Sequence, residues 1–281
     1  MRGTVVVSGV FLLALTLQPA AQASAVAELA FDGASTVAPV TVPFNFGNQP
    51  LGQISDLGFT LCFRQEASPS GACDQSGRVT QQQSLAPPFF VAGVFRETLA
   101  TGAKTPVSFP VDLAVGQRLS VLIQWVASEV GPAADTLALH GTSTGGGDDD
   151  FILNLTGSGV LPEPCPPVGF RELCLNNNRF KVQIHFLTSA ADSGLANGVK
   201  LTSDTGFFYF FTPANVEAIV KVLNACQAPF NRYWVFVAGL TDVRTMITVT
   251  DLEHNAVKTY VNPQGRAFQP IQDTSAFATC P

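Results

Sequence analysis

Short runs rich in Val, Leu, Ile, Thr and Phe, each closed by Gly, Pro or Asp, constrain the first half of the chain more than any other feature. In residues 119–125 apolar and polar side chains largely alternate, as they do in a half-buried strand. No helical stripe of about 12 residues competes with these runs. Many short strands at this spacing predict a β-sandwich over residues 35–160. The predicted strands are residues 36–46, 57–64, 106–115, 118–126, 136–140 and 151–156.

A proline-rich stretch separates the two halves, because residues 161–167 read Leu-Pro-Glu-Pro-Cys-Pro-Pro. Prolines this dense favour extended backbone and cannot lie inside a sheet, so the stretch is expected to be a linker.

The second half, residues 168–281, also has strand periodicity. Phe180, Val182 and Ile184 share one face of an alternating run that places His185 on the polar side. Residues 245–250 and 257–261 predict a hairpin whose turn holds Asn255 in the left-handed conformation. The expected fold is therefore all-β, with two immunoglobulin-like β-sandwich domains joined by the proline-rich linker.

Two segments of the second half are harder to interpret. Residues 215–225 fit either a helix or a strand, and the Val content together with the β neighbours favours a strand. Residues 206–213 read Gly-Phe-Phe-Tyr-Phe-Phe-Thr-Pro, and alternation places aromatic rings on both faces. Burial of each ring is worth about 1.5–3 kcal/mol, so this run is expected to be the central strand of the domain, covered on both sides.

The N-terminus has the pattern of an export signal. Arg2 supplies the positive charge, residues 5–17 are apolar, and Ala21-Gln22-Ala23 is a small-x-small cleavage site. The apolar run is shorter than the roughly 20 residues that a transmembrane helix needs. A signal peptide over residues 1–23 and no transmembrane anchor are therefore expected, with a secreted, periplasmic or cell-surface location.

Cysteine usage agrees with export, since the chain has six cysteines, an even number. Cys62 and Cys73 lie in the first half and are expected to pair. Three connectivities remain open for Cys165, Cys174, Cys226 and Cys280, of which Cys165–Cys174 with Cys226–Cys280 is favoured. A zinc site is the alternative for these four, but no Cys-x-x-Cys pair is present.

The charges and motifs exclude several functions. A net charge of −6 with 15 scattered Lys and Arg residues argues against nucleic-acid binding. Asp192-Ser193-Gly194 and Asp204-Thr205-Gly206 have the form in which aspartic proteases present a carboxylate, but the flanking residues differ and ordinary turns explain both. His140, His185 and His254 accompany no nucleophile-elbow or zinc-protease motif. No catalytic residue and no cofactor are expected.

The aspartates at 148–150 follow three glycines and form a candidate calcium loop. They lack the spaced pattern of a calcium loop, because adjacent residues of an extended chain point apart. A solvated hairpin tip, without metal, is expected.

Three segments of the first half carry a family resemblance. Residues 44–52, 115–121 and 153–160 resemble the immunoglobulin-like domains of the hydin and choice-of-anchor type, whereas residues 68–88 depart from that pattern. The resemblance implies a scaffold or a binding module.

The second half resembles an uncharacterised family of bacterial secreted β-domains, for which no activity is implied. The segments that carry this resemblance are residues 174–176, 179–180, 201–206, 221–223, 234–236, 249–251, 258–260 and 262–263.

Three functional hypotheses follow. The first is a non-catalytic extracellular structural or binding module of a bacterial exported protein, whose partner is an extracellular protein or a polysaccharide. The second is a carbohydrate-binding accessory protein that uses exposed Tyr209, Tyr233 or Trp234, and the third is a secreted hydrolase. A partly exposed aromatic row favours sugar binding, whereas an unpaired edge strand favours assembly with proteins.

Overall fold

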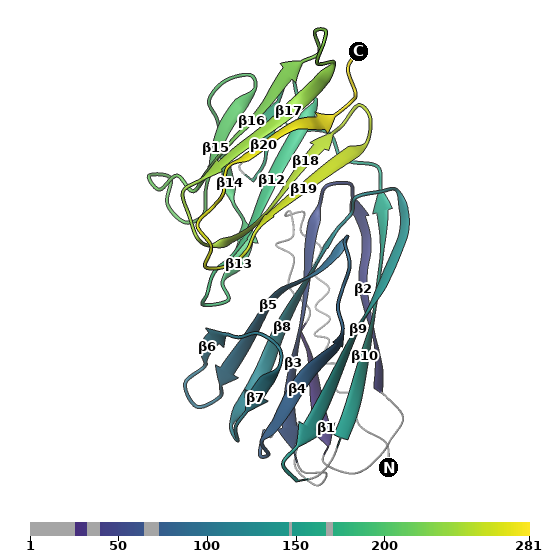
Figure 1. The fold of residues 1–281 in the computed structure, drawn as a ribbon, viewed down its shortest axis with the longest axis vertical. Coiled ribbons are helices and arrows are strands. Elements are labelled where there is room, and N and C mark those ends of the chain that lie inside the picture. The colour runs from purple at the N-terminus through teal and green to yellow at the C-terminus, as the bar shows by residue number, and fades with distance from the viewer. Residues whose placement is uncertain (1–25, 33–39, 65–72, 146–147, 167–170) are drawn as a thin grey trace, which may run out of the picture. The chain divides into compact units, whose positions relative to one another are not determined.

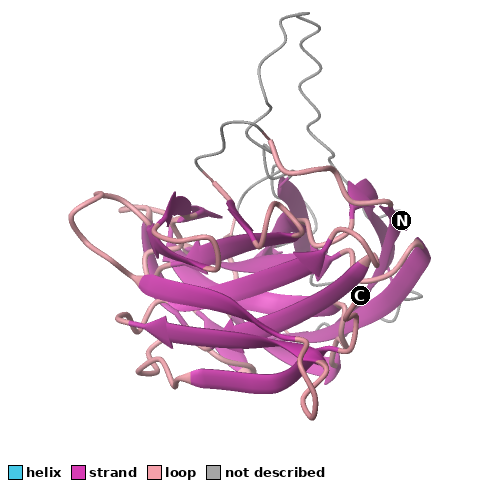
Figure 2. Ribbon diagram, turned by 90° about the horizontal axis from the view of Figure 1, so that it is seen from above, coloured by secondary structure: helices cyan, strands magenta, loops and turns pink. Residues whose placement is uncertain are grey.

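The structure, a computed structural model, describes residues 26–32, 40–64, 73–145, 148–166 and 171–281 (Figure 1). All the regular secondary structure in these ranges is β-strand, as Figure 2 shows. The predicted signal peptide lies outside the described residues. No helix in the described ranges is long and apolar enough to cross a membrane.

The chain divides into two compact units. The first consists of residues up to Gly47, Ser55–Trp125 and Pro132–Gly157. The second consists of Asn48–Ile54, Val126–Gly131 and Ser158–Pro281. Four five-stranded sheets, which we name A to D, are consistent with two β-sandwich domains.

Sheets A and B belong to the first half of the chain, and in sheet A the edge strand β1 runs parallel to β3. In spatial order, sheet A contains β1 (Val26–Asp32), β3 (Ile54–Arg64), β8 (Gln117–Val126), β5 (Phe89–Thr98) and β6 (Ala103–Pro106). Sheet B contains β2 (Val40–Pro50), β10 (Asp148–Val160), β9 (Gly131–Ser143), β4 (Gly77–Gln83) and β7 (Val111–Leu113).

The core of the first unit forms where aromatic residues from three strands meet. The rings of Phe46, Phe89 and Trp125 lie 5.8–6.0 Å from one another between centroids. Trp125 is 1% exposed. Gly157 of β10 lies under this indole, since a Cβ built there would come within 2.8 Å of the ring. Only glycine lets the strand approach the ring so closely.

Sheets C and D belong to the second half of the chain. In spatial order, sheet C contains β11 (Leu173–Leu175), β12 (Phe180–Leu187), β18 (Arg244–Asp251) and β19 (Ala256–Asn262), and β13 (Ser193–Leu195) also pairs with β12. Sheet D contains β14 (Asn197–Lys200), β15 (Thr205–Tyr209), β16 (Ala218–Ala225), β17 (Arg232–Gly239) and β20 (Ile271–Phe277).

The apolar faces of sheets C and D enclose the core of the second unit, to which β12, β16, β17 and β18 contribute fully buried residues. Strands β12 and β18 are buried along their whole length, on both faces. The polar side of β12, which carries His185, is therefore covered rather than solvated. Gly239 of β17 lies under the ring of Phe268, 2.2 Å from a Cβ built at that glycine.

Several sequence predictions are confirmed. The ambiguous segment forms strand β16 from Ala218 onwards. Strands β18 and β19 pair antiparallel, and Asn255 between them has a φ of 55°. The structure also contains all three favoured disulfides, Cys62–Cys73, Cys165–Cys174 and Cys226–Cys280. Three disulfides indicate an oxidising compartment, either extracellular or periplasmic.

Two strand predictions are wrong. Residues 106–115 are not one strand: Pro106 ends β6, and only Val111–Leu113 form a strand, β7, because the chain leaves sheet A after Pro106 and joins sheet B at Val111. The aromatic run ends as strand β15 at Tyr209, and β15 is the second strand of sheet D rather than its centre. Phe208 is fully buried, but Phe207 and Tyr209 are only half-buried and Phe211 is 62% exposed. One face of this strand is therefore covered and the other is not.

Candidate functional site

The outward side of sheet D is the part of the second unit that most resembles a binding surface. Strands β15, β16 and β17 alternate, so that Phe208, Val220 and Val235 point into the core. The residues between them point outwards, away from sheet C. We call this surface the aromatic face; it consists of Phe207, Tyr209, Ile219, Leu223, Trp234 and Phe236.

Strand register aligns these side chains across the sheet. Phe207 pairs with Val199 on one side and with Ile219 on the other. Leu223 pairs with Trp234 in the neighbouring ladder. Directly paired residues on one face have Cβ atoms about 4.5–5.5 Å apart, so the side chains of each pair touch. Lys221 lies between Ile219 and Leu223 on the same side of β16 and pairs with Phe236, so a charged residue interrupts the apolar surface.

The aromatic face is open to solvent to a degree that core residues are not. Ile219 is 39% exposed, and the four aromatic side chains around it are half-buried. On β17, the rings of Trp234 and Phe236 meet edge to face, with centroids 6.2 Å apart. Phe230, which is 54% exposed, packs edge to face on the other side of Trp234 at 4.9 Å. These contacts hold the indole in one orientation.

Two charged residues, Lys221 and Arg232, lie on the same side of the sheet as the aromatic face, and Lys221 is paired. Lys221 of β16 lies 3.0 Å from the carboxylate of Asp204. A hydrogen bond from Thr202, aided by Thr205 and Lys221 and opposed by burial, lowers the pKa of Asp204 to about 2. In contrast, the hydroxyl of Tyr209 has no hydrogen-bond partner among the described residues. The face thus offers apolar rings and one available hydroxyl, with no net charge from the Lys221–Asp204 pair.

Asp204 yields a test of acid stability. Its carboxyl has a pKa of about 2 in the folded chain and about 3.9 in the unfolded chain. The ionised carboxylate therefore makes its full contribution to the free energy of unfolding above about pH 4, and this contribution is lost as the pH falls to about 2. We expect Asp204→Asn to lower the free energy of unfolding by up to about 2 kcal/mol at neutral pH and by nearly nothing at pH 2. Urea unfolding at both pH values measures this, and an equal loss at both would contradict it.

Of the three residues proposed from the sequence as ligand contacts, two are on the surface of the structure and one is buried. Tyr209 and Trp234 lie on the aromatic face. The proposal for Tyr233 is wrong, because Tyr233 is 4% exposed and points inwards, where its ring lies 4.8 Å from that of Phe180. The sequence reasoning missed Phe207, Ile219 and Phe236 as surface residues. Alternation with the buried valines of β16 and β17 was the signal that could have identified the last two.

A polar cluster inside the second unit is centred on Arg179. The guanidinium donates two hydrogen bonds to Asp251, at 3.2 and 2.9 Å, and one to the hydroxyl of Tyr233 at 3.2 Å. It also donates to the carbonyl of Thr279 and lies 4.5 Å above the ring of Tyr233. Burial alone would raise the pKa of Asp251, but the hydrogen bonds from Arg179 and Thr279 outweigh it and lower that pKa.

The same cluster contains the metal-binding geometry found in the described ranges. Ligand atoms of Asp251, Glu253 and His254 lie within 4.8 Å of one another. Arg179 contacts each of them, with distances of 3.0 Å to Glu253 and 3.2 Å to Nδ1 of His254. A metal ion would therefore have to displace a buried guanidinium, and the cluster is better explained as structural.

The other candidate residues do not come together as a catalytic site. Ser193 and Gly194 of the first Asp-Ser-Gly triplet lie in β13 of sheet C, whereas Thr205 and Gly206 of the second lie in β15 of sheet D. Asp204 is kept ionised by its hydroxyl and lysine partners rather than sharing a proton with a second carboxyl. His140 lies 2.8 Å from Asp150, one of the three aspartates of the candidate calcium loop.

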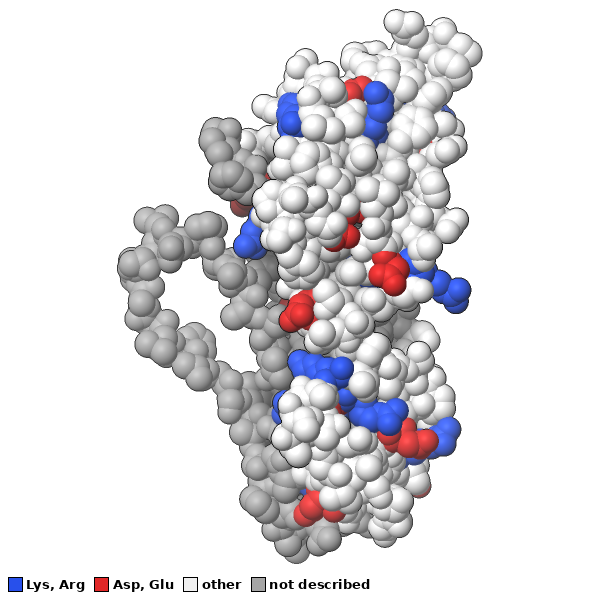
Figure 3. Space-filling model, turned by 90° about the vertical axis from the view of Figure 1, so that its left-hand side faces the viewer, with Lys and Arg blue, Asp and Glu red and all other residues white. Residues whose placement is uncertain are grey.

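Concave sites lie elsewhere on the second unit. One cavity of about 490 Å³ is lined by Glu172, Lys200 and the Cys165–Cys174 disulfide. In it, Lys200 already donates to the carbonyl of Cys174 at 2.7 Å. A second cavity, of about 580 Å³, lies in the connection between β19 and β20. The surface in Figure 3 shows acidic and basic groups interspersed among uncharged ones.

Comparison with known proteins gives distant structural similarity only. No family model matches the chain, and no curated protein is similar to it. VesB protease from Vibrio cholerae is 19% identical over 43% of this chain and 30% of its own, with a TM-score of 0.28. PapD-like domain 7 of human CEP192 is 10% identical over 54% of this chain and 99% of its own, with a TM-score of 0.26.

A putative carbohydrate binding protein from Bacteroides ovatus is 11% identical over 84% of this chain and 69% of its own, with a TM-score of 0.20. These scores describe distant similarity only. No residue role is transferred from any of these proteins.

Proposed function

We propose that the chain is a non-catalytic binding module of an exported bacterial protein and that the aromatic face of sheet D is its binding surface. The observation that carries this proposal is the row of half-exposed rings aligned by strand register, in which the charge of Lys221 is neutralised by Asp204. Contiguous exposed apolar patches on folded domains mark interaction sites. In addition, Asp204 of the Asp-Thr-Gly triplet is paired with Lys221 rather than with a second carboxylate.

A polysaccharide is the ligand class that this surface fits best. The apolar faces of sugar rings stack on aromatic side chains, and their hydroxyls need donors and acceptors rather than charges. Phe207 on β15 and Trp234 on β17 supply rings on either side of β16, and Tyr209 supplies a hydroxyl that is available for hydrogen bonding. Because both rings lie on the same side of the sheet, an extended glycan chain that crosses β16 can contact rings of both strands at once.

Trp234→Ala tests the proposal. We expect the full chain to bind at least one polysaccharide in a panel of cellulose, chitin, xylan and mannan, and Trp234→Ala to weaken that binding at least about tenfold, since central aromatic anchors contribute about 2 kcal/mol or more. Affinity electrophoresis and pull-down on the insoluble polymers measure the binding.

Leu240→Ala is the matched control, because Leu240 is 68% exposed, directly follows β17 and lies outside the aromatic face. It should leave binding unchanged. Failure of the full chain to bind any member of the panel, or equal binding by Trp234→Ala, would sink the proposal.

A further inference from the structure

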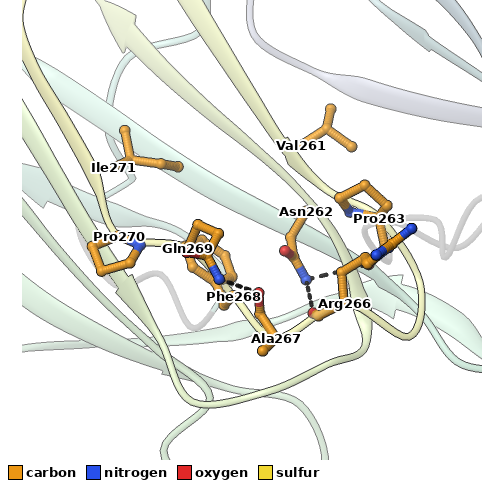
Figure 4. A pocket seen from close by; sticks show the side chains of 9 residues that line it. All are labelled: Val261, Asn262, Pro263, Arg266, Ala267, Phe268, Gln269, Pro270 and Ile271. Atoms are coloured by element: carbon orange, nitrogen blue, oxygen red, sulfur yellow. Dashed lines mark hydrogen bonds between the residues drawn. The ribbon is translucent and has the colours of Figure 1, made fainter.

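The connection between β19 and β20 forms a preformed pocket at one side of the second unit. Nine residues line a cavity of about 580 Å³ (Figure 4). Most of the lining is apolar, with Val261 and Pro263 on one side and Phe268, Pro270 and Ile271 on the other. Its size falls within the roughly 300–1,000 Å³ of small-molecule sites and is more than enough for an apolar side chain.

The side chain of Asn262 holds the wall of this pocket in place. It is 6% exposed, and its Nδ2 donates to the carbonyls of Arg266 at 3.0 Å and of Val243 and Pro263 at 3.4 Å. The N–H of Gly265, a residue with a φ of 70°, donates to the carbonyl of Asp242 at 2.8 Å. On the opposite side, Phe268 packs against Gly239 of β17. These contacts hold both walls of the cavity in place.

The rim of the pocket carries the positively charged side chain of Arg266. Arg266 is exposed and lines the cavity, and its guanidinium forms no ion pair or hydrogen bond with any described residue. In contrast, the buried guanidinium of Arg179 has its donors engaged. Arg266 is thus available to a carboxylate, which a guanidinium binds through two parallel hydrogen bonds.

The pocket lies at the end of an open sheet edge. Strand β19 is the last strand of sheet C, and within the described residues it pairs only with β18. Every second residue of such a strand directs its N–H and C=O away from the sheet. Val261, the last residue before Asn262, belongs to this edge, lines the pocket and is 41% exposed. The unpaired N–H and C=O groups of an edge strand can form hydrogen bonds with the backbone of another extended chain.

We propose that this edge and pocket form a peptide-binding site. An extended peptide would pair with the edge of β19, place an apolar side chain in the pocket, and present an acidic group to Arg266. This inference rests on residues outside the aromatic face, so it stands or falls separately from polysaccharide binding.

Selection from a random peptide library displayed on phage, with the full chain as bait, tests the proposal. We expect enriched sequences to combine an apolar residue with a neighbouring acidic residue or a free C-terminal carboxylate. Arg266→Gln should weaken binding of the enriched synthetic peptide at least about tenfold, as expected for the loss of a charge-assisted hydrogen bond. Ala267→Phe, which places a ring inside the pocket from an exposed position, should do the same without lowering the melting temperature.

Two controls separate this site from others. Arg232→Gln removes a cation from β17 and should leave peptide binding unchanged, as should Trp234→Ala. A peptide N-methylated at alternate amides keeps its side chains but cannot pair with the edge, and it should not bind. The proposal would be overturned if no peptide were enriched, or if both pocket variants bound the peptide as tightly as the unmodified chain does. Full binding of the N-methylated peptide would overturn it as well.

Discussion

Arg179→Met is expected to destabilise the second unit by about 3–5 kcal/mol, because it leaves the buried carboxylate of Asp251 without its guanidinium partner. The Asp251 side chain is 0% exposed and that of Arg179 is 6% exposed, so water cannot replace the lost hydrogen bonds. Methionine retains much of the volume beside Phe180 and Tyr233, so the loss reports the charge rather than a cavity. Urea denaturation measures it.

Fluorescence can resolve the unfolding of the two units, since the two tryptophans lie one in each: Trp125 in the first and Trp234 in the second. In a Trp125→Phe background the emission reports the second unit alone. The matched control is Lys221→Met, which breaks the more exposed Lys221–Asp204 pair and should cost no more than about 1 kcal/mol. Arg179→Met combined with Asp251→Leu should recover part of the loss. A cost for Arg179→Met as small as that of Lys221→Met would refute the argument.

Replacing both Cys226 and Cys280 with Ala should cost about 4 kcal/mol, again in the second unit. The disulfide closes a loop with a sequence separation of 54, and closing such a loop restricts the unfolded chain by about this amount. The bond also fixes the end of the chain next to Thr279, whose hydroxyl donates to Asp251 at 2.6 Å. Urea denaturation of the oxidised protein and of the double variant, followed by Trp234 emission, gives the difference.

The Cys62–Cys73 disulfide provides the comparison, since its separation is 11 and it lies in the first unit. Its removal should cost about 3 kcal/mol and alter the Trp125 transition instead. If both double variants shifted the same transition, the two units would not unfold independently.

Much of the fold was predictable from local patterns. Alternation identified strands β8, β12, β18 and β19, because a period of two places side chains on opposite faces whatever the neighbouring strands are. The disulfide pairing followed from cysteines that are near in sequence within each half. For residues 215–225 the pattern fits both a helix and a strand, and the strands predicted on either side favoured the strand.

The alternating pattern of a strand does not predict whether each of its two faces is buried or exposed to solvent. The aromatic run that includes Phe207 and Phe208 was expected to be covered on both sides, yet only the side of Phe208 packs against sheet C. Strand order decides this, and strand order depends on contacts between residues far apart in sequence.

The same limit explains the errors in the candidate site. Tyr233 and Trp234 are adjacent, so one had to point inwards and the other outwards, but periodicity alone does not say which. The Arg179 cluster was invisible for a related reason, since Asp251 and Thr279 are 72 and 100 residues from Arg179.

The glycines that lie under aromatic rings have a consequence for tracing the ancestry of this chain. Gly157 under Trp125 and Gly239 under Phe268 each leave no room for a Cβ, so a larger residue at either glycine requires a change at its ring partner. Diverged homologues should therefore show compensated substitutions, in which a larger residue replaces glycine only where a smaller one replaces the ring. Such linked positions would persist after overall identity has faded, and could identify relatives that ordinary sequence similarity does not.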